Sequence, residues 1–436
     1  MGTAGKARGR AAAVTPARAC AFAVIRRVFE QGAYADRALH AEASALGPRE
    51  RALATALVYG TIQRRATLDY VASELGTRPP GRLDPPVLAA LRLGLFQLLF
   101  LAGIPEHAAV NESVELVKRS HRSATSYLNA ILRRAARDGP GLLERLDDET
   151  PAGAAIAHSV PHWLAERWWA ELGAAQARAL LARINEPAES AIRVNELVAT
   201  REEVIAALPV PAAPAPELAE GLILGGPFDA HGSELFAAGA IMPQSRGSML
   251  VARALAPQPG EHVLDLCAAP GAKTTHLAAL MRDEGTLVAV ERNAGRARAL
   301  ERTAARMRAR CVRVVHGDAA AFVGEQPFDR VLVDPPCSGL GTLQSRPDLR
   351  WRAGPDAILE LAALQLAIIE AAAANTAPGG LLVYSVCTIS RAESEDVIDA
   401  FLARHDDFEA LGPPRQLLPH LDGTDGFFIA RVRRAS

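Results

Sequence analysis

Two cysteines of this 436-residue chain follow apolar stretches that are typical of buried β-strands. Cys387 comes directly after residues 382–386, and Cys337 follows residues 330–333 by way of Asp334 and two prolines. In a parallel α/β sheet, ligands bind outside the carboxyl ends of the strands. Both thiols are therefore expected at a ligand-binding edge, on strands that neighbour each other and close to the carboxyl group of Asp334.

Two thiols beside a carboxyl group suit one reaction in particular, the transfer of a methyl group to C5 of a cytosine. C5 is a poor nucleophile, but addition of a thiolate to C6 makes the ring enamine-like, so that C5 can attack a methyl donor. The C5 proton must then leave so that the thiol can be eliminated, and a carboxyl group near N3 assists. An ordinary thiol, with a pKa of about 8.5, is only a few per cent ionised near neutrality. Free cysteines are also common core residues. For either thiol taken alone, a core position is as reasonable an interpretation as a catalytic role.

A loop of small residues follows the first expected strand and lets a ligand approach the main chain closely. Its residues are Cys267, Ala268, Ala269, Pro270, Gly271, Ala272 and Lys273. The loop is not a Walker A phosphate loop, because Ala272 stands where that motif requires glycine, and the chain has no G-x-G-x-x-G. Acidic residues follow the next strands: Glu291, which can accept hydrogen bonds from a ribose diol, then Asp318 and Asp334. These features predict a site for an adenosine ligand that has no phosphate-binding loop.

The elements that position these residues are short apolar stretches alternating with helical ones. The expected strands are residues 262–266, 287–290, 312–315, 330–333 and 381–384. Continuous apolar strands with helices between them indicate a parallel sheet that is covered on both faces. Residues 408–410 and 427–430 are expected to add a terminal hairpin to this sheet.

Three domains are expected from the length and the change of pattern along the chain. Residues 1–150 form an all-α domain, 151–240 a small α+β region that links the domains and positions RNA, and 241–436 the α/β domain. In the middle region, a strand over 191–195 precedes a Pro-rich loop over 209–216. The tryptophans of this region, Trp163, Trp168 and Trp169, are interpreted as core residues.

The N-terminal domain reads as successive helices that begin at prolines. Residues 86–101 are apolar nearly all round and are expected to form a central buried helix. Basic residues on neighbouring helices are either ordinary exposed positions or RNA contacts, and the candidates for RNA binding are Lys118, Arg119, Arg133 and Arg134. The first 27 residues add a basic run, Lys6, Arg8, Arg10, Arg18, Arg26 and Arg27.

The composition is that of a soluble globular protein, with 49% hydrophobic residues, 22% charged residues and a formal net charge of -1. Five scattered cysteines without a CxxC pair argue against a disulfide framework and favour a reducing cytoplasm. No metal site is expected. No apolar run is judged long enough to cross a bilayer, and the N-terminus lacks the apolar core of a signal peptide.

Five motifs of the chain resemble the RNA 5-methylcytosine methyltransferase family that uses S-adenosylmethionine. They are DLCAAPGAKTTH (265–276), DPPCSG (334–339), RPDLRW (346–351), VYSVC (383–387) and DGFFIA (425–430). Residues 106–118 and 128–134 resemble the NusB-like RNA-binding domain of one subgroup. The fused domain narrows the resemblance to the bacterial small-subunit ribosomal RNA subgroup, the RsmB (Sun/Fmu) type.

The resemblance implies a Rossmann-like class I methyltransferase domain with S-adenosylmethionine as cofactor. Residues 267–273 would bind the methionine and adenosine portions of the donor, Glu291 the ribose hydroxyls, and Asp318 would lie at the adenine. Asp334 would reach the methionine end and the target base. The partner would be small-subunit ribosomal RNA, in the cytoplasm, with no membrane or metal, and the protein is expected to be a monomer.

For the two thiols, the resemblance implies that Cys387 is the nucleophile and Cys337 helps to release the product. Three residues depart from the family pattern: Ala272 replaces a usual glycine, Glu291 a usual aspartate, and Val386 a common threonine. None of these departures removes a reacting group.

Other functions remain open from the sequence. In DNA cytosine methyltransferases the thiol after the fourth strand is the nucleophile, which would give Cys337 that role. A transfer RNA is another possible substrate. The third alternative is an RNA-binding protein of the ribosome-assembly or antitermination type with a degenerate methyltransferase site.

Overall fold

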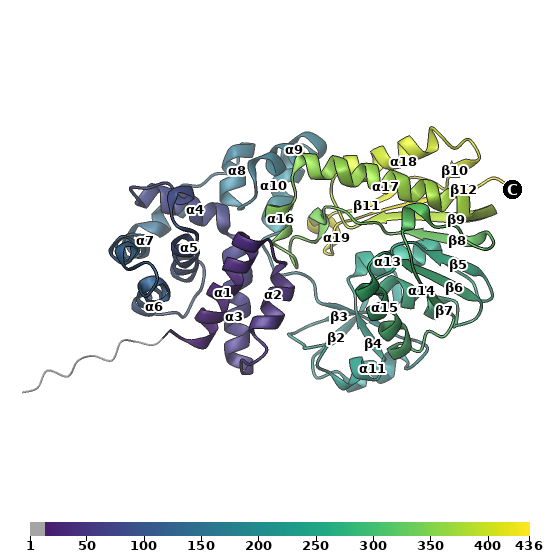
Figure 1. Ribbon diagram of the computed structural model, residues 1–436, viewed down its shortest axis with the longest axis horizontal. Helices are drawn as coiled ribbons and strands as arrows, with labels where there is room; N and C mark the ends of the chain where they lie inside the picture. The colour runs from purple at the N-terminus through teal and green to yellow at the C-terminus, as the bar shows by residue number, and fades with distance from the viewer. Residues whose placement is uncertain (1–13) are drawn as a thin grey trace, which may run out of the picture. The chain divides into compact units, whose positions relative to one another are not determined.

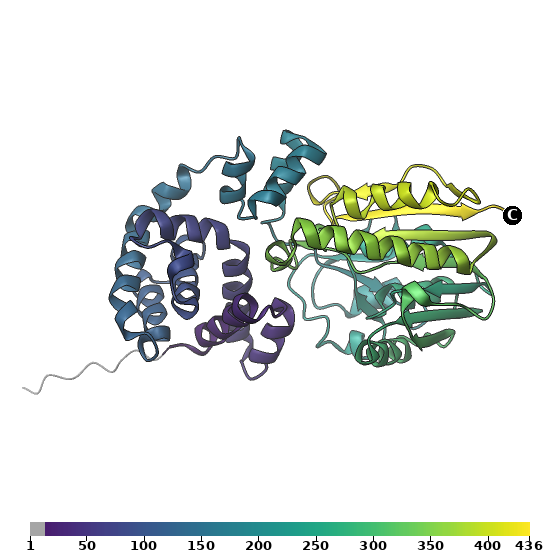
Figure 2. The same cartoon turned by 45° about the horizontal axis from the view of Figure 1, so that its top comes forward.

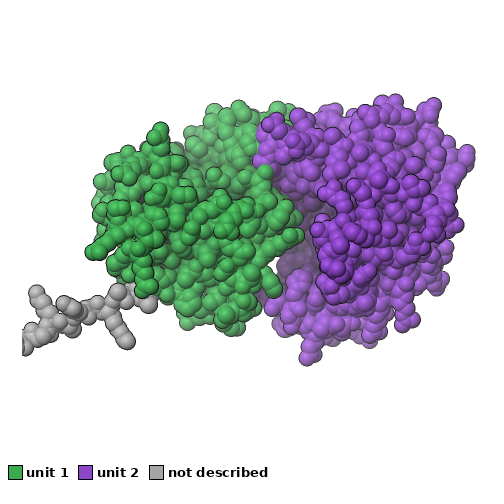
Figure 3. Space-filling view, viewed as in Figure 1, with its two compact units in different colours: residues 1–185, 346–352 green, residues 186–345, 353–436 purple. Residues whose placement is uncertain are grey.

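The computed structural model describes residues 14–436, so the basic residues Lys6, Arg8 and Arg10 lie outside the described part of the chain. The chain divides into two compact units. One consists of Met1–Asn185 with Arg346–Arg352, and the other of Glu186–Ser345 with Ala353–Ser436; Figure 3 colours them separately.

The first unit is helical, as its apolar spacing predicted. Its α-helices are α1 (Pro16–Gln31), α2 (Ala35–Glu42), α3 (Pro48–Gln63), α4 (Arg65–Leu75), α5 (Pro85–Leu99), α6 (Glu106–Lys118), α7 (Thr125–Glu144), α8 (Pro151–Ala157), α9 (His162–Leu172), α10 (Ala174–Arg183) and α16 (Leu349–Arg352). Short 3-10 turns lie at η1 (Pro80–Arg82) and η2 (Arg122–Ala124).

The central buried helix is confirmed as α5, in which Leu91, Leu93 and Leu95 are fully buried. Of the three tryptophans interpreted as core residues, Trp168 is fully buried, whereas Trp163 and Trp169 are only half-buried.

A short segment from far along the chain completes this helical unit. Residues 346–352, which carry the RPDLRW motif, belong to it although the chain on either side belongs to the second unit. Arg350 is fully buried, and its guanidinium donates to the carbonyl oxygen of Ser159 at 3.0 Å and to Asn185 Oδ1 at 3.1 Å. The indole of Trp351 donates to the carbonyl oxygen of Ile62 at 2.7 Å. The motif therefore contributes buried hydrogen bonds to the helical core.

The second unit contains two sheets, of which the smaller is antiparallel in the order β2-β3-β1-β4. Its strands are β1 (Ala191–Val194), β2 (Ala212–Ala215), β3 (Leu218–Leu224) and β4 (Ile241–Pro243), with α11 (Arg201–Ala207) and α12 (Glu234–Ala237) beside them. The expectation of a Pro-rich loop over 209–216 is wrong in part, because β2 lies within it. As an edge strand, β2 tolerates Pro214, whose missing N–H removes no bond from the interior of the sheet.

The larger sheet has the order β10-β12-β9-β8-β5-β6-β7, with β11 paired to β12. Its strands are β5 (His262–Asp265), β6 (Thr286–Glu291), β7 (Val312–His316), β8 (Phe328–Val333), β9 (Thr376–Val386), β10 (Phe408–Ala410), β11 (Arg415–Leu417) and β12 (Phe427–Arg434). The five predicted strands are parallel to one another, and β10 and β12 are the antiparallel addition that the sequence predicted (Figure 1). The short strand β11, which also pairs with β12, was not predicted. The chain thus has the predicted fold class, a helical domain and a Rossmann-like α/β domain.

Alternate side chains of the central strands enter two separate cores. Leu264, Val331 and Val333 pack into one core, while Val263 and Leu332 pack into the other. This alternation explains the continuous apolar runs, since both faces of a parallel sheet are covered by helices. The helices of this unit are α13 (Arg246–Leu255), α14 (Ala272–Leu280), α15 (Ala294–Arg306), α17 (Pro355–Asn375), α18 (Glu395–Leu402) and α19 (Pro419–Asp422), with 3-10 turns η3 (Ala319–Ala321), η4 (Leu340–Thr342) and η5 (Arg391–Glu393).

One of these helices contradicts the expectation that no apolar run is long enough to cross a bilayer. By length and composition alone α17, with 21 residues, passes that test. Its Ile368, Ile369 and Ala372 pack into the core of the larger sheet, along which the helix runs in Figure 2. The apolar composition therefore has an explanation in the packing of a long covering helix.

Candidate active site

The two thiols meet because their strands are direct neighbours. β8 and β9 pair in parallel, with Val333 opposite Tyr384, so the loops that follow them leave the same edge of the sheet. The sulfurs of Cys337 and Cys387 lie 3.4 Å apart. The predicted adjacency of the two strands is confirmed, and Cys387 stands one residue past the end of β9.

Asp334 lies at the same edge, between the loop over 267–273 and β9. Its Oδ2 is 2.8 Å from Lys273 Nζ, and its Oδ1 accepts a hydrogen bond from Ser385 Oγ at 3.0 Å. Burial alone would lower the pKa of Lys273, but the charge and the hydrogen bond of Asp334 outweigh it and raise that pKa above its ordinary value. Lys273 is therefore charged at neutral pH, and the pair fixes the carboxylate.

The environment of Cys337 is unfavourable for a thiolate. Its hydrogen bond with the Cys387 sulfur, its burial and the negative charges nearby raise the pKa of Cys337 well above that of an ordinary thiol. Cys337 therefore holds its proton more firmly than a free cysteine does, and its sulfur becomes a strong base once that proton is lost.

The small-residue loop and two carboxylates line one pocket. The lining residues are Asp265, Cys267, Ala268, Ala269, Pro270, Ala272, Lys273 and Asp334. Gly271 has a φ of +105°, and a Cβ there would lie 2.7 Å from Leu300 Cδ1, so the turn requires glycine. The pocket offers carboxylate acceptors and small side chains, and its one cation, Lys273, is already paired with Asp334. These groups fit a ligand with hydroxyl and ammonium donors, such as a nucleoside that carries an amino acid, better than they fit a phosphate.

Two groups in the pocket have strongly shifted pKa values. Asp265 is almost fully buried, and burial raises its pKa to about 7, although Thr274 Oγ1 donates to its Oδ2 at 2.8 Å. Burial likewise raises the pKa of Cys267 far above its ordinary range, so this thiol is not a nucleophile at neutral pH.

The structure places Glu291 and Asp318 near the pocket strands but not in the pocket lining. Glu291 ends β6, the neighbour of β5, and accepts from the backbone N–H of Asn293 at 2.8 Å. Asp318 follows β7, is exposed, and accepts from the backbone N–H of Ala320 at 3.1 Å. Both roles in donor binding stay predictions.

The RNA-binding candidates are exposed positions of the helical unit. Lys118 is 51% exposed and pairs with Glu115 at 2.7 Å, and Arg119 follows it at the end of α6. On α7, Arg133 donates to Asn129 Oδ1 at 3.2 Å and Arg134 to the carbonyl oxygen of Leu75 at 2.9 Å. Their assignment to RNA also stays a prediction.

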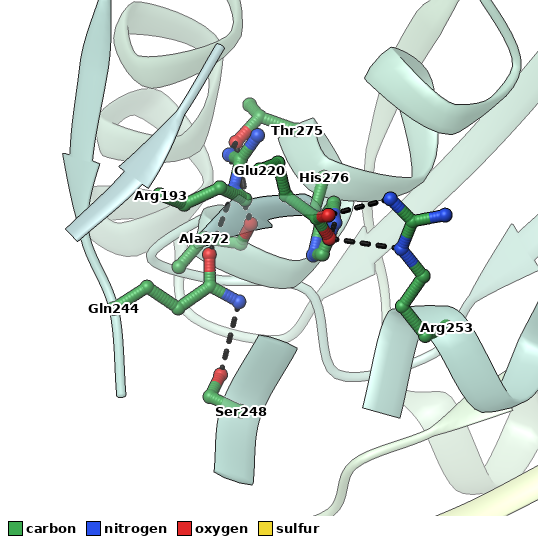
Figure 4. Close-up of polar contacts among 8 residues, drawn as sticks. All are labelled: Arg193, Glu220, Gln244, Ser248, Arg253, Ala272, Thr275 and His276. Carbon is green, nitrogen blue, oxygen red and sulfur yellow. Dashed lines mark hydrogen bonds and ion pairs between the residues drawn. The ribbon is translucent and has the colours of Figure 1, made fainter. Parts of the chain in front are cut away.

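A buried polar network that the sequence did not predict holds α14, the helix that begins at the end of the loop over 267–273. Arg193 of β1 is fully buried and donates to Thr275 Oγ1 and to Gln244 Oε1, both at 2.9 Å (Figure 4). Glu220 of β3 lies 2.6 Å from His276 Nε2 and accepts from Arg253 on α13. The smaller sheet thus holds two successive residues of α14.

Burial governs the ionisation of this network. It lowers the pKa of Arg193 to about 9, which leaves the guanidinium charged at neutral pH. It lowers the pKa of His276 to about 4, against the opposing effect of Glu220, so the imidazole is neutral. His276 then donates its Nε2–H to the Glu220 carboxylate, whose pKa is held below its ordinary value, despite burial, by hydrogen bonds from His276 and Arg253.

Family models match three consecutive parts of the chain. The description "16S rRNA methyltransferase RsmB/F" matches residues 252–433, the NusB family residues 15–137, and a ferredoxin-like domain of RsmF/B-like methyltransferases residues 160–231. The last match covers most of the smaller sheet.

Known proteins match the chain along nearly its whole length. A Synechocystis protein described as a probable ribosomal RNA small subunit methyltransferase B is 37% identical, over 96% of this chain and 99% of the relative. A Thermus thermophilus ribosomal RNA small subunit methyltransferase B is also 37% identical, over 96% and 98%. The crystal structure of PH0851 superposes with a TM-score of 0.83 at 28% identity, covering 98% of this chain and all of that one. This chain belongs to the RsmB/F family of RNA methyltransferases, as its motifs predicted.

Proposed function

We propose that this protein transfers a methyl group from S-adenosylmethionine to C5 of a cytosine in small-subunit (16S) ribosomal RNA, through a covalent bond between Cys387 and C6. The observation that carries the proposal is the 3.4 Å separation of the Cys337 and Cys387 sulfurs beside Asp334. The names of the relatives, which are ribosomal RNA small subunit methyltransferases, support the substrate class.

When bound, S-adenosylmethionine supplies an electrophilic methyl group. Residues 267–273 would hold its methionine and adenosine portions, Glu291 its ribose hydroxyls, and Asp318 would lie at its adenine. The fit rests on the acceptor character of the pocket, which is lined by Asp265, Asp334 and small side chains.

Cys387 attacks C6 of the cytosine, which places an electron pair at C5 for the new bond to the methyl carbon. Asp334, held by Lys273 and Ser385, faces the base and assists at N3. The C5 proton then leaves, and the electron pair of the C6–S bond returns to Cys387. We assign this release to Cys337, whose sulfur lies 3.4 Å from that of Cys387: as a thiolate, after its own proton has passed to solvent, it takes the C5 proton.

The RNA would be single-stranded or splayed at the target, because a stacked cytosine hides its C6 face and extrusion costs a few kcal/mol. Phosphate contacts would come from Lys118, Arg119, Arg133 and Arg134 of the helical unit. A reaction on ribosomal RNA would take place in the cytoplasm.

Trapping of the covalent adduct tests the assignment of the thiols. Small-subunit ribosomal RNA is incubated with labelled donor and with the wild type, Cys387→Ala or Cys337→Ala, and the modified base is mapped. We expect Cys387→Ala to give neither product nor adduct, and Cys337→Ala to accumulate adduct. An adduct that survives Cys387→Ala and disappears with Cys337→Ala would instead give Cys337 the role it has in DNA cytosine methyltransferases. Failure of the wild type to bind the donor would favour an RNA-binding protein with a degenerate site.

A further inference from the structure

A fully buried carboxylate, Glu393, lies in η5 just beyond the end of β9 and takes no part in the chemistry described above. A buried carboxylate is costly unless hydrogen-bond donors surround it. Its partners therefore indicate which part of the structure it organises.

The side chain of Glu393 connects the two loops that carry the thiols. Its Oε1 accepts from the backbone N–H of Ser338 at 2.8 Å, and its Oε2 from the Ser338 hydroxyl at 2.5 Å. The Thr388 hydroxyl lies 2.6 Å from Ser338 Oγ and 3.4 Å from Glu393 Oε2. Ser338 directly follows Cys337, and Thr388 directly follows Cys387. One carboxylate therefore holds the neighbours of both thiols.

The position of Glu393 is itself fixed from two other elements. Gln365 on α17 donates to Glu393 Oε1 at 3.2 Å and to the carbonyl oxygen of Pro336 at 2.9 Å. The Tyr384 hydroxyl, on β9, donates to the main-chain carbonyl oxygen of Glu393 at 2.7 Å. Since α17 and β9 belong to the core of the sheet, the carboxylate is a rigid reference point for the thiol loops.

A main-chain bond also joins the two thiol loops. The backbone N–H of Gly341 donates to the carbonyl oxygen of Cys387 at 3.1 Å. Removal of the Glu393 carboxylate would leave the buried N–H of Ser338 without its acceptor, which favours movement of the loop that carries Cys337. A shift of about one ångström at a reacting group is enough to slow a reaction by orders of magnitude.

We propose that Glu393 is a positioning residue that sets the distance between the Cys337 and Cys387 sulfurs, and thereby the rate of product release. The effect on release rests on the proposed function, whereas the effect on the sulfur–sulfur distance does not.

The distance is tested without RNA or donor. Dibromobimane, a bifunctional thiol reagent, becomes fluorescent when it bridges two neighbouring thiols, and Cys337→Ala gives the background from the other cysteines. We expect Glu393→Ala to reduce the bridging rate about tenfold or more, and Glu393→Gln, which keeps an acceptor for the Ser338 N–H, to restore most of it. Wild-type bridging by a folded Glu393→Ala protein would overturn the proposal. If Glu393→Ala does not fold, Ser338→Ala serves, because it removes the hydroxyl link and keeps the backbone bond.

The consequence for release is tested with RNA and donor. We expect Glu393→Ala to raise the ratio of covalent adduct to released product, and Glu393→Gln, which restores most of the bridging, to bring that ratio back close to the wild-type value. A parallel loss of adduct and product, together with unchanged bridging, would show a merely structural role and overturn the proposal. If the wild type forms no adduct but the bridging rates differ as expected, the proposed function fails while the positioning role stands.

Discussion

Lys273 Nζ lies 2.8 Å from Asp334 Oδ2, so the last residue of the loop over 267–273 is tied to the first residue after β8. The side chains are only 14% and 25% exposed, and the contact joins the two parts of the site that must act together. Loss of either partner leaves a charge with little solvent to stabilise it.

We expect Lys273→Met to weaken donor binding about tenfold or more, because Asp334 and the loop over 267–273 lose the contact that holds them in place. Lys273→Arg, which keeps the charge, is the matched control and should lose less. Calorimetric titration with S-adenosylmethionine measures the difference. Equal affinity of Lys273→Met and the wild type would contradict a role of this pair in the donor site.

We expect Arg193→Met to lower the free energy of unfolding by about 2–4 kcal/mol, since Gln244 and Thr275 lose a buried charged donor. The double variant with Thr275→Val and Arg193→Met should lose less free energy of unfolding than the two single variants together, because both changes remove the same hydrogen bond. Urea unfolding of the four proteins completes this cycle. Strict additivity would show that the contact carries no coupling energy.

A third expectation concerns the pH dependence of stability. Burial lowers the pKa of His276 from its ordinary 6.5 to about 4. As the pH falls from 6.5 to 4, the unfolded chain binds a proton that the folded chain does not, so stability decreases; the loss between pH 6.5 and 5 is about 2 kcal/mol. In His276→Gln this part of the pH dependence should disappear, while His107→Gln, at an exposed position, should keep it. Identical pH profiles for His276→Gln and the wild type, measured by urea unfolding, would refute the assignment.

RNA binding by the helical unit predicts a salt effect. Neutralising Lys118, Arg119, Arg133 and Arg134 together should weaken binding and reduce the slope of log affinity against log salt, by about 0.7 for each lost phosphate contact to a single strand. Arg298→Ser with Arg302→Ser, at exposed positions of α15, is the control and should change neither quantity. Fluorescence anisotropy with a labelled ribosomal RNA fragment gives both. An unchanged slope in the fourfold variant would place the RNA contacts elsewhere.

The sequence predicted those parts of the fold that follow from local pattern. The strands that end at Val333 and Val386 are rich in apolar residues near their carboxyl ends. Because β8 and β9 are neighbours, their ends bring Cys337 and Cys387 to one edge of the sheet. α17 contradicts the prediction that no apolar run is long enough to cross a bilayer. Its three acidic residues, Asp356, Glu360 and Glu370, are spread over 21 residues, and the helix still passes the test of length and composition.

The residues that the sequence did not predict are polar groups whose partners lie far away along the chain. Arg193 and Thr275 are 82 residues apart, and Glu393 and Ser338 are 55 apart. The local sequence around a buried charged residue does not indicate which distant residue will be its partner. Ser385 is an exception, because it stands two residues before Cys387 in the VYSVC motif and could have been noticed there.

The RPDLRW segment has a consequence for how this protein can be divided. Arg350 and Trp351 are encoded between the two halves of the methyltransferase domain, yet their hydrogen bonds end on Ser159, Asn185 and Ile62 of the helical unit. A fragment cut at residue 185 would therefore keep every helix before the cut and still lack part of its own interior. The helical unit is therefore not one continuous stretch of sequence, and a version of it that is expressed alone or fused to another protein must include residues 346–351.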